Sequence, residues 1–221
     1  MAKPFVNPFV SGQFLELRVD VLVSDGRGLG RHDGVVVLVE DALPGQLVRA
    51  RVAAVRKSLA EAALVEVLER SPDEQEPPCP HAGRCGGCSW QSLAYGRQLA
   101  WKERIVHDAL ERVGKVACPP MLPILPSPSE WGYRNKMEFA FGVSGDGGKA
   151  LGLRERGSRN IVEVTGCLLQ TPLTMRVLEA VRMLSNGAFH DLDGRFLVVR
   201  EPNAGGCFCL LYTSPSPRDG A

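Results

Sequence analysis

Three cysteines crowded into ten residues are the feature that most constrains this chain. Cys79, Cys85 and Cys88 lie in the segment Cys-Pro-His-Ala-Gly-Arg-Cys-Gly-Gly-Cys, residues 79 to 88. Thiols this close in sequence can converge on one inorganic centre, and Gly86 and Gly87 let the backbone pass near it. Buried free cysteines would be scattered along the chain instead of gathered in a loop rich in Pro and Gly. The pattern predicts a metal-binding loop that takes a fourth ligand from elsewhere.

The best-placed candidate for the fourth ligand is Cys167. It follows a strand-like run and precedes a helix start, so its side chain can point back toward the loop. Cys118 is followed by two prolines, and Cys207 and Cys209 lie in the last stretch of the chain. The expected ligand set is therefore Cys79, Cys85, Cys88 and Cys167.

The spacing of these cysteines favours iron over zinc. Structural zinc usually pairs two C-x2-4-C knuckles, whereas five residues separate Cys79 from Cys85 and the fourth cysteine is single. A compact trio with one remote cysteine suits an iron–sulfur cluster. Zinc, disulfides and unliganded thiols are the alternatives.

Composition bounds the class of protein. With 221 residues, 44% of them hydrophobic, the chain can form one large or two modest domains with real cores. A formal net charge of +1 gives no whole-protein signal for nucleic acid, so a basic surface must be local. No apolar run has membrane-spanning length and residues 1 to 12 lack an export signal, so no membrane partner is expected and we predict a cytoplasmic protein with reduced thiols.

The N-terminal part reads as a series of short strands. Apolar residues alternate from Leu15 to Val21, and strands are predicted over 13–24, 34–39, 46–55 and 62–68, with glycine-rich turns at 25–30 and 43–45. Closely spaced strands of this kind predict a small OB-type barrel at residues 11–71, after an extension at 1–10. The glycine cluster is not a nucleotide-binding loop, because no long helix follows it. Lys57 and the arginines at 27, 31, 49, 51 and 56 are either a solvated face or contacts to nucleic acid.

The remainder reads as a mixed region. Residues 72–92 are a linker and the cysteine loop, residues 93–114 a helix ended by Gly114, and residues 115–205 an α+β central domain that is incomplete. In that domain we predict strands at 131–141, 151–154, 160–164 and 195–200, and a helix that opens at Thr171-Pro172. Residues 206–221 lack a packing pattern beyond Cys209 and resemble the translated read-through of a sequencing adapter, so we expect a non-native tail. The predicted fold class is mainly β with an α/β part.

Basic residues gather in the predicted central strands. They are Arg134, Lys136, Arg154, Arg156 and Arg159, with Tyr133 and Asn135 among them. Such interleaving suits contact with RNA phosphates and unstacked bases. The alternative is surface salt bridging to Glu138, Glu155 and Glu163.

The order of these pieces resembles the RNA (uracil-5-)-methyltransferase family, in particular its iron–sulfur members that modify ribosomal RNA. The matching stretches, over roughly residues 12 to 200, are Gly26-Arg27-Gly28-Leu29-Gly30, Ala42-Leu43-Pro44-Gly45, the Cys79 to Cys88 loop, Tyr95-x2-Gln98-Leu99-x2-Lys102, Tyr133-Arg134-Asn135-Lys136, and Ile161 to Val164 leading to Cys167. The first two are similar to a TRAM domain.

The resemblance implies a transferase that moves a methyl group from S-adenosylmethionine to carbon 5 of uridine, with a cysteine nucleophile and a carboxylate base. It also implies a 4Fe-4S cluster on the four cysteines, a ribosomal RNA partner, with transfer RNA second, and a monomer. In the family the cofactor domain, nucleophile and base lie beyond residues that match here. We therefore expect this polypeptide to be an N-terminal fragment that neither binds S-adenosylmethionine nor transfers methyl groups.

Two other classes of protein share parts of this pattern. A methylthiotransferase also carries a TRAM domain and a cluster, but it calls for a C-x3-C-x2-C trio and a barrel at the C-terminal end. A stand-alone RNA-binding module with a zinc or iron–sulfur clip stays open, and a zinc form would be colourless.

Overall fold

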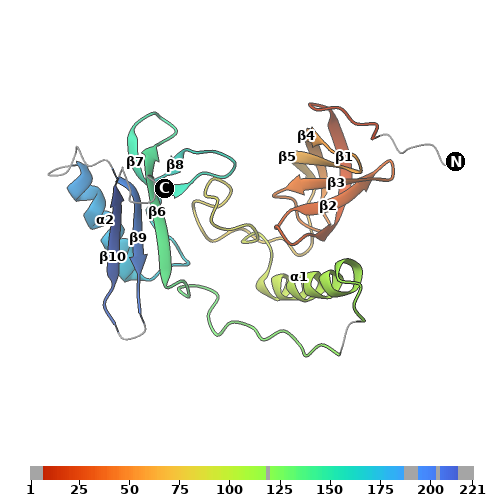
Figure 1. Ribbon diagram of the computed structural model, residues 1–221. Helices are drawn as coiled ribbons and strands as arrows, with labels where there is room; N and C mark the ends of the chain where they lie inside the picture. Colours follow the sequence, from red (N-terminus) through yellow and green to blue (C-terminus); the bar gives the residue numbers. More distant parts are fainter. Residues whose placement is uncertain (1–6, 118–119, 187–193, 203–204, 214–221) are drawn as a thin grey trace. The chain divides into compact units, whose positions relative to one another are not determined.

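The computed structural model describes residues 7–117, 120–186, 194–202 and 205–213. The chain forms two compact units (Figure 1). The barrel unit comprises Met1–Pro77 and Ser89–Pro126, and the sheet unit comprises Pro78–Cys88 and Ser127–Ala221. The cysteine loop therefore belongs to the sheet unit, although the sequence on both sides of it belongs to the barrel unit.

The barrel unit contains a closed five-stranded barrel with strand order β1-β2-β3-β5-β4. Its strands are β1 (Phe14–Leu22), β2 (Gly28–His32), β3 (Val35–Glu40), β4 (Leu47–Val55) and β5 (Leu59–Glu69). Leu15, Leu17 and Val19 alternate into the core, and β3 pairs with β5 in parallel while the other pairs are antiparallel. The predicted OB-type barrel and the mainly β fold class are confirmed.

Strand β2 differs from the sequence prediction, which assigned its glycines, Gly28 and Gly30, to a turn over residues 25–30. A Cβ at Gly28 would lie 2.6 Å from the carbonyl oxygen of Ala42, and one at Gly30 would lie 2.2 Å from that of Arg18. Glycine is needed at both positions because neighbouring backbone approaches too closely for any side chain. The glycine-rich stretch is thus a strand of the barrel, and the turn is confined to the residues before Gly28.

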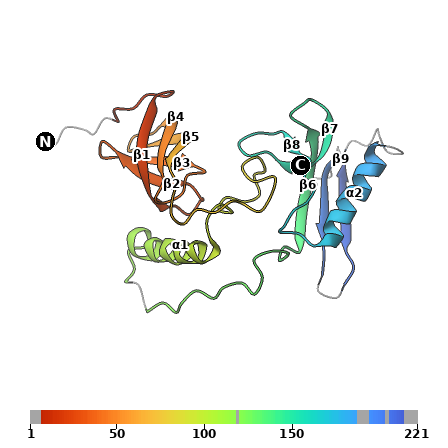
Figure 2. The same cartoon turned by 180° about the vertical axis from the view of Figure 1, so that it is seen from behind.

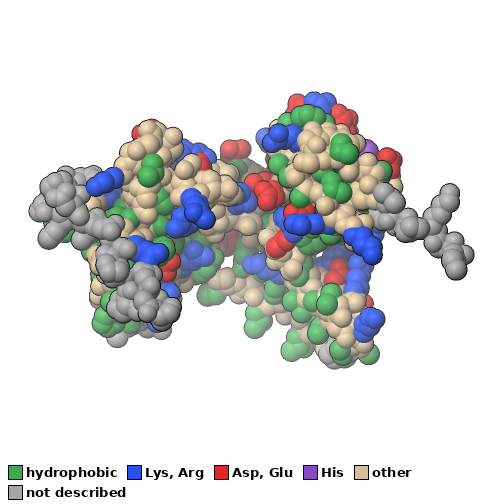
Figure 3. All heavy atoms as spheres, turned by 45° about the horizontal axis from the view of Figure 1, so that its top comes forward, with side chains coloured by type: hydrophobic (Ala, Val, Ile, Leu, Met, Phe, Trp, Pro, Cys, Tyr) green, Lys and Arg blue, Asp and Glu red, His purple; other side chains and the backbone are tan. Residues whose placement is uncertain are grey.

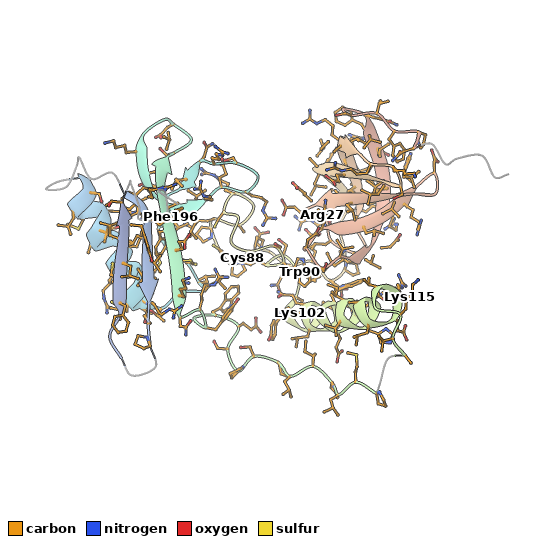
Figure 4. All side chains as sticks on the ribbon, viewed as in Figure 1. Arg27, Cys88, Trp90, Lys102, Lys115 and Phe196 are labelled. Carbon is orange, nitrogen blue, oxygen red and sulfur yellow. The ribbon has the colours of Figure 1, made fainter. Side chains whose placement is uncertain are left out.

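Below the barrel a second apolar cluster holds the helix α1 (Tyr95–Asp108), which continues as a π-helical turn over Ala109–Val113. Trp101 is the buried residue of α1, and it packs with Leu22, Leu43 and Leu93. Trp90, between Arg27 and Lys102 in Figure 4, packs on the same cluster and donates from its indole to the carbonyl of Gly26 at 3.0 Å. Val106 and Val113, further along the helical segment, are 50% and 83% exposed.

The sheet unit is a five-stranded sheet with α2 (Pro172–Asn186) against one face (Figure 2). The strand order is β10-β9-β6-β7-β8, with β6 (Lys136–Val143), β7 (Lys149–Arg154), β8 (Ile161–Val162), β9 (Gly194–Arg200) and β10 (Phe208–Thr213). The core on the α2 side consists of Met137, Phe139, Leu151, Val162, Val164, Leu178, Leu197 and Val199. A smaller cluster of Ala140, Ala150, Ile161 and Phe196 (labelled in Figure 4) lies apart from this core.

Strand β10 differs from the sequence prediction, which expected residues 206–221 to form a tail without a packing pattern. β10 pairs with β9 in antiparallel register from Phe208 to Thr213, although all six of its side chains are exposed. Backbone pairing therefore extends the sheet where the side-chain pattern gave no signal. Residues 214 to 221, which carry most of the adapter-like sequence, lie outside the described residues. Within the described chain, no helix is long and apolar enough to cross a bilayer.

Candidate metal centre and basic surface

The cysteine loop is fixed to the sheet unit by a short backbone ladder. Gly86 donates its amide to the carbonyl of Arg154 at 3.0 Å, and Arg156 donates to the carbonyl of Arg84 at 2.8 Å. These bonds make an isolated antiparallel bridge between Cys85 and Glu155. A Cβ at residue 86 would lie 3.3 Å from the Arg154 oxygen, so the glycine allows the loop to approach the β7 end.

The loop is also folded on itself and tied to the segment before Cys167. The amide of Ala82 bonds to the Cys79 carbonyl at 3.0 Å, and that of Cys85 to the His81 carbonyl at 2.9 Å. The imidazole of His81 contacts Thr165, two residues before the fourth candidate ligand. The loop and the Cys167 segment are thus held side by side within one unit.

All four candidate thiols are partly buried. Burial raises the pKa of the Cys85 thiol, with further increases from the neighbouring Cys88 and Cys79. Burial likewise raises the pKa of Cys167, with smaller contributions from Cys88 and Cys85. Because such effects weaken with distance, Cys88 and Cys79 lie near Cys85, and Cys88 and Cys85 lie near Cys167.

A backbone amide points at the sulfur atom of Cys85, since Gly87 donates to its Sγ at 3.4 Å. Backbone hydrogen bonding at Leu169 and Gln170 lowers the pKa of Cys167 against the larger effect of burial, and the Gln170 amide donates to the Cys167 carbonyl at 3.0 Å. Amide donors of this kind stabilise thiolates and tune iron–sulfur clusters. The donor set of four thiols with amide hydrogen bonds fits an iron–sulfur cluster.

Among the described residues, no three His, Cys, Asp or Glu side chains form a group that could hold a metal ion. Of the other cysteines, Cys207 and Cys209 are exposed near β10, and Cys118 lies outside the described residues.

The six basic residues predicted to contact RNA fall in different settings. Lys57 is exposed in the barrel unit, and the other five belong to the sheet unit. Lys136 is exposed at the start of β6, while Arg134 is half-buried before it. Arg154 and Arg159 are exposed, and Arg154 donates to the Arg159 carbonyl at 3.3 Å. Arg156 is half-buried and its guanidinium donates to the Cys88 carbonyl, so it braces the cysteine loop.

The barrel arginines are largely engaged with acids. Arg49 bridges Glu16 and Glu66 at 2.8 and 2.9 Å, and Arg27 pairs with Asp25 at 2.6 Å. Figure 3 shows acidic and basic side chains next to one another over the barrel. The solvated-face interpretation therefore describes these arginines better than a row of free phosphate ligands.

Two basic residues of the sheet unit were not singled out from the sequence. Arg200 is exposed at the end of β9, directly opposite Lys136 on β6. Arg182 of α2 donates to the carbonyls of Leu151 and Val164. Arg182 stands four residues after the buried Leu178, on the same helix face, which is a signal for burial. The residue opposite Arg200 depends on strand register, which the sequence does not give.

Residues 8–65, which include most of the closed barrel, match the TRAM domain model. The chain is 46% identical over 96% of its length to a protein of Nitratidesulfovibrio vulgaris named as an uncharacterized RNA methyltransferase, covering 47% of that protein. It is 37% identical over 83% of its length to the 23S rRNA (uracil(1939)-C(5))-methyltransferase RlmD of Acidithiobacillus ferrooxidans, covering 41% of it.

The likeness predicted from the sequence is confirmed: most of the chain is similar to proteins named RNA methyltransferases, and residues 8–65 match the TRAM domain model. It spans about half the length of the curated relatives it matches. Among solved structures, the Pyrococcus abyssi tRNA (uracil-54, C5)-methyltransferase in complex with S-adenosyl-L-homocysteine aligns with a TM-score of 0.62 at 22% identity, over 92% of this chain and 48% of that one. At 22% identity, the likeness to this solved structure concerns the fold alone.

Proposed function

We propose that this chain is the RNA-binding and cluster-holding N-terminal part of an S-adenosylmethionine-dependent enzyme that forms 5-methyluridine in 23S ribosomal RNA. The observation that carries the proposal is the similarity of nearly the whole chain to proteins named RNA methyltransferases, RlmD among them. The TRAM barrel agrees with it, because small OB-type barrels commonly bind nucleic acid. Transfer RNA is the second candidate substrate, and a cytoplasmic monomer is the proposed state.

Cys79, Cys85, Cys88 and Cys167 would hold a 4Fe-4S cluster in this proposal. The support is the partial burial of all four thiols, the effects of neighbouring thiols on the pKa of Cys85 and of Cys167, and the Gly87 amide directed at Cys85. Bound iron would supply covalent links between the ligand loop and the Cys167 segment, and so contribute to folding. His81 joins the loop to the Cys167 segment through Thr165, and Arg156 braces the loop by donating to the Cys88 carbonyl.

The methyl-transfer chemistry belongs, in this proposal, to a part of the enzyme that the 221 residues do not include. That chemistry needs a thiolate that attacks carbon 6 of uridine and a carboxylate that removes the carbon-5 proton. Cys207 and Cys209 are exposed on or beside the edge strand β10, and within the described part of the chain no side chain hydrogen-bonds to either, so they are not proposed as nucleophiles. The 221-residue polypeptide is expected to be inactive by itself.

The test compares the 221-residue chain with the protein encoded by the intact reading frame. Anaerobic purification should give a brown chain that contains iron and sulfide and binds 23S ribosomal RNA, but transfers no label from S-adenosylmethionine. The intact protein should form 5-methyluridine in 23S transcripts, detected by mass spectrometry, and less in transfer RNA. A colourless chain that contains zinc, together with an intact protein lacking methylation, would favour a stand-alone RNA-binding module.

A further inference from the structure

Three exposed side chains form one row across three neighbouring strands of the sheet unit. Lys136 of β6 is directly opposite Arg200 of β9, and Arg200 is directly opposite Phe208 of β10. Residues in register on neighbouring strands project from the same face of a sheet. Met137 and Val199, their neighbours along the strands, belong to the core under α2, so the row lies on the face away from α2.

The Lys136–Arg200 pair places two positive charges side by side. Directly opposite residues have Cβ atoms about 5 Å apart, where like charges destabilise a sheet. Among the ion pairs between described residues, none includes Lys136 or Arg200. Glu138 lies two residues along the same face, yet it forms no ion pair with either of them in the described structure. The arrangement therefore favours an anion that lies over both side chains.

Phe208 adds an aromatic surface to these charges. Phe208 is 65% exposed, more than Leu210, Leu211 and Tyr212 of the same strand. An aromatic ring beside two cations matches an unpaired nucleotide, which offers a base to stack and a phosphate to neutralise. Bases in a duplex are already stacked with each other, so a duplex could use only the charges.

We propose that the Lys136–Arg200–Phe208 row binds single-stranded RNA, with one backbone phosphate between the two cations and an adjacent base stacked on Phe208. The proposal rests on the RNA-binding function proposed above and identifies the surface and the RNA form. Arg200 and Phe208 are RNA contacts that were not predicted from the sequence, and Lys136 shares its phosphate with Arg200. Arg134, Arg154 and Arg159 are not needed for this site.

The experiment measures binding of a fluorescent single-stranded ribonucleotide, such as a 12-residue oligouridylate, by anisotropy over a series of salt concentrations. Lys136→Gln and Arg200→Gln should each weaken binding about tenfold at low salt, as expected for one charge-assisted hydrogen bond. Each should also reduce the slope of log affinity against log salt by about 0.7. Phe208→Ala should weaken binding by a similar factor with an unchanged slope, and Phe208→Trp should restore it.

Arg176→Gln is the matched control, because Arg176 is an exposed arginine on α2, which covers the other face. It should leave both the affinity and the salt slope near the wild-type values. A second readout needs no RNA: neutralising Lys136 or Arg200 should raise the melting temperature at low salt, and the gain should disappear at high salt as the repulsion is screened. The same RNA sequence in a duplex should bind more weakly and should not respond to Phe208→Ala.

The outcomes separate the two proposals. If the wild-type chain binds no RNA, the proposed function is overturned together with this site. If wild-type binding is retained in all three variants with unchanged salt slopes, the row is not the site, while RNA binding by the chain stands. Equal losses for Arg176→Gln and Arg200→Gln would mean that charge alone matters, and would overturn the row.

Discussion

The backbone amide of Thr165 donates a hydrogen bond to Nε2 of His81 over 3.1 Å, and the Thr165 hydroxyl lies 3.2 Å from the same nitrogen. The two residues are 84 positions apart in the sequence. His81 lies within the ligand loop, and Thr165 lies two residues before Cys167. This contact therefore joins the two segments that supply the candidate ligands.

Replacing His81 should loosen that junction. His81→Ala leaves the Thr165 amide without its acceptor, and the metal-free chain should lose about 1 kcal/mol of unfolding free energy, measured by urea denaturation. With the proposed cluster loaded, the same variant should bleach faster in air. Thr165→Ala is the control, because it keeps the backbone donor, and should stay close to wild type. Equal stability of His81→Ala and wild type would show that the contact contributes nothing.

The proposed ligand set predicts a sharp division among the cysteines. Serine at position 79, 85, 88 or 167 should abolish the visible absorption and most of the bound iron and sulfide of anaerobically purified protein, since each thiolate binds iron directly. Cys209→Ser should retain them, because that side chain is exposed on β10. Full iron and sulfide in Cys167→Ser would show that the fourth ligand lies elsewhere.

The carboxylate of Glu201 predicts a dependence of stability on acid. Hydroxyl hydrogen bonds from Thr171 and Thr174 hold its pKa below the ordinary value of 4.5, and the Thr174 amide donates to it at 3.1 Å. A lowered carboxyl pKa contributes stability that is present above 4.5 and is lost as pH falls through the lowered value. These hydrogen bonds hold the first turn of α2 against Glu201, directly after β9.

The melting temperature of the wild-type chain should therefore fall steeply below pH 4.5, and that of Glu201→Gln should fall less steeply. Glu163→Gln, at an exposed position after β8, is the matched control and should leave the wild-type slope unchanged. Parallel melting curves for wild type and Glu201→Gln across this range would contradict the assignment.

The barrel could be predicted because its strands alternate, as β1 shows with Leu15, Leu17 and Val19 directed inward. Strand β2 could not, because Gly28 and Gly30 are needed for contacts with distant backbone, while their local sequence is that of a turn. The helix after the cysteine loop was predicted, but its buried anchor was not. Trp101 is buried by residues such as Leu22 and Leu43, far away in sequence.

Three candidate ligands were predicted from cysteine spacing and the fourth from its place between a strand and a helix, whereas their supporting contacts were not predicted. The spacing of cysteines is a local property, and three of the four lie within ten residues. The supporting contacts of His81 and Arg156 join residues that are 84 and 68 positions apart, as the bonds to Thr165 and Cys88 show. Arg156 was expected on an RNA-binding surface, because its sequence neighbours are basic, but the pairing of the loop with β7 turns it toward Cys88.

Arg182 links the helix α2 to β7 and to the segment between β8 and the fourth candidate ligand. Its guanidinium donates to the Leu151 carbonyl at 2.9 and 2.7 Å and to the Val164 carbonyl at 3.0 Å, and only 13% of the side chain is exposed. Arg182→Leu leaves these buried carbonyls without donors, so the free energy of unfolding should fall by about 2–3 kcal/mol, measured in urea. Arg182→Lys should recover only part of the loss, since one ammonium cannot reproduce the planar fork. Arg176→Leu, an exposed change on the same helix, should stay within about 0.5 kcal/mol of wild type, and an equal effect of the two leucine variants would refute the bracing role.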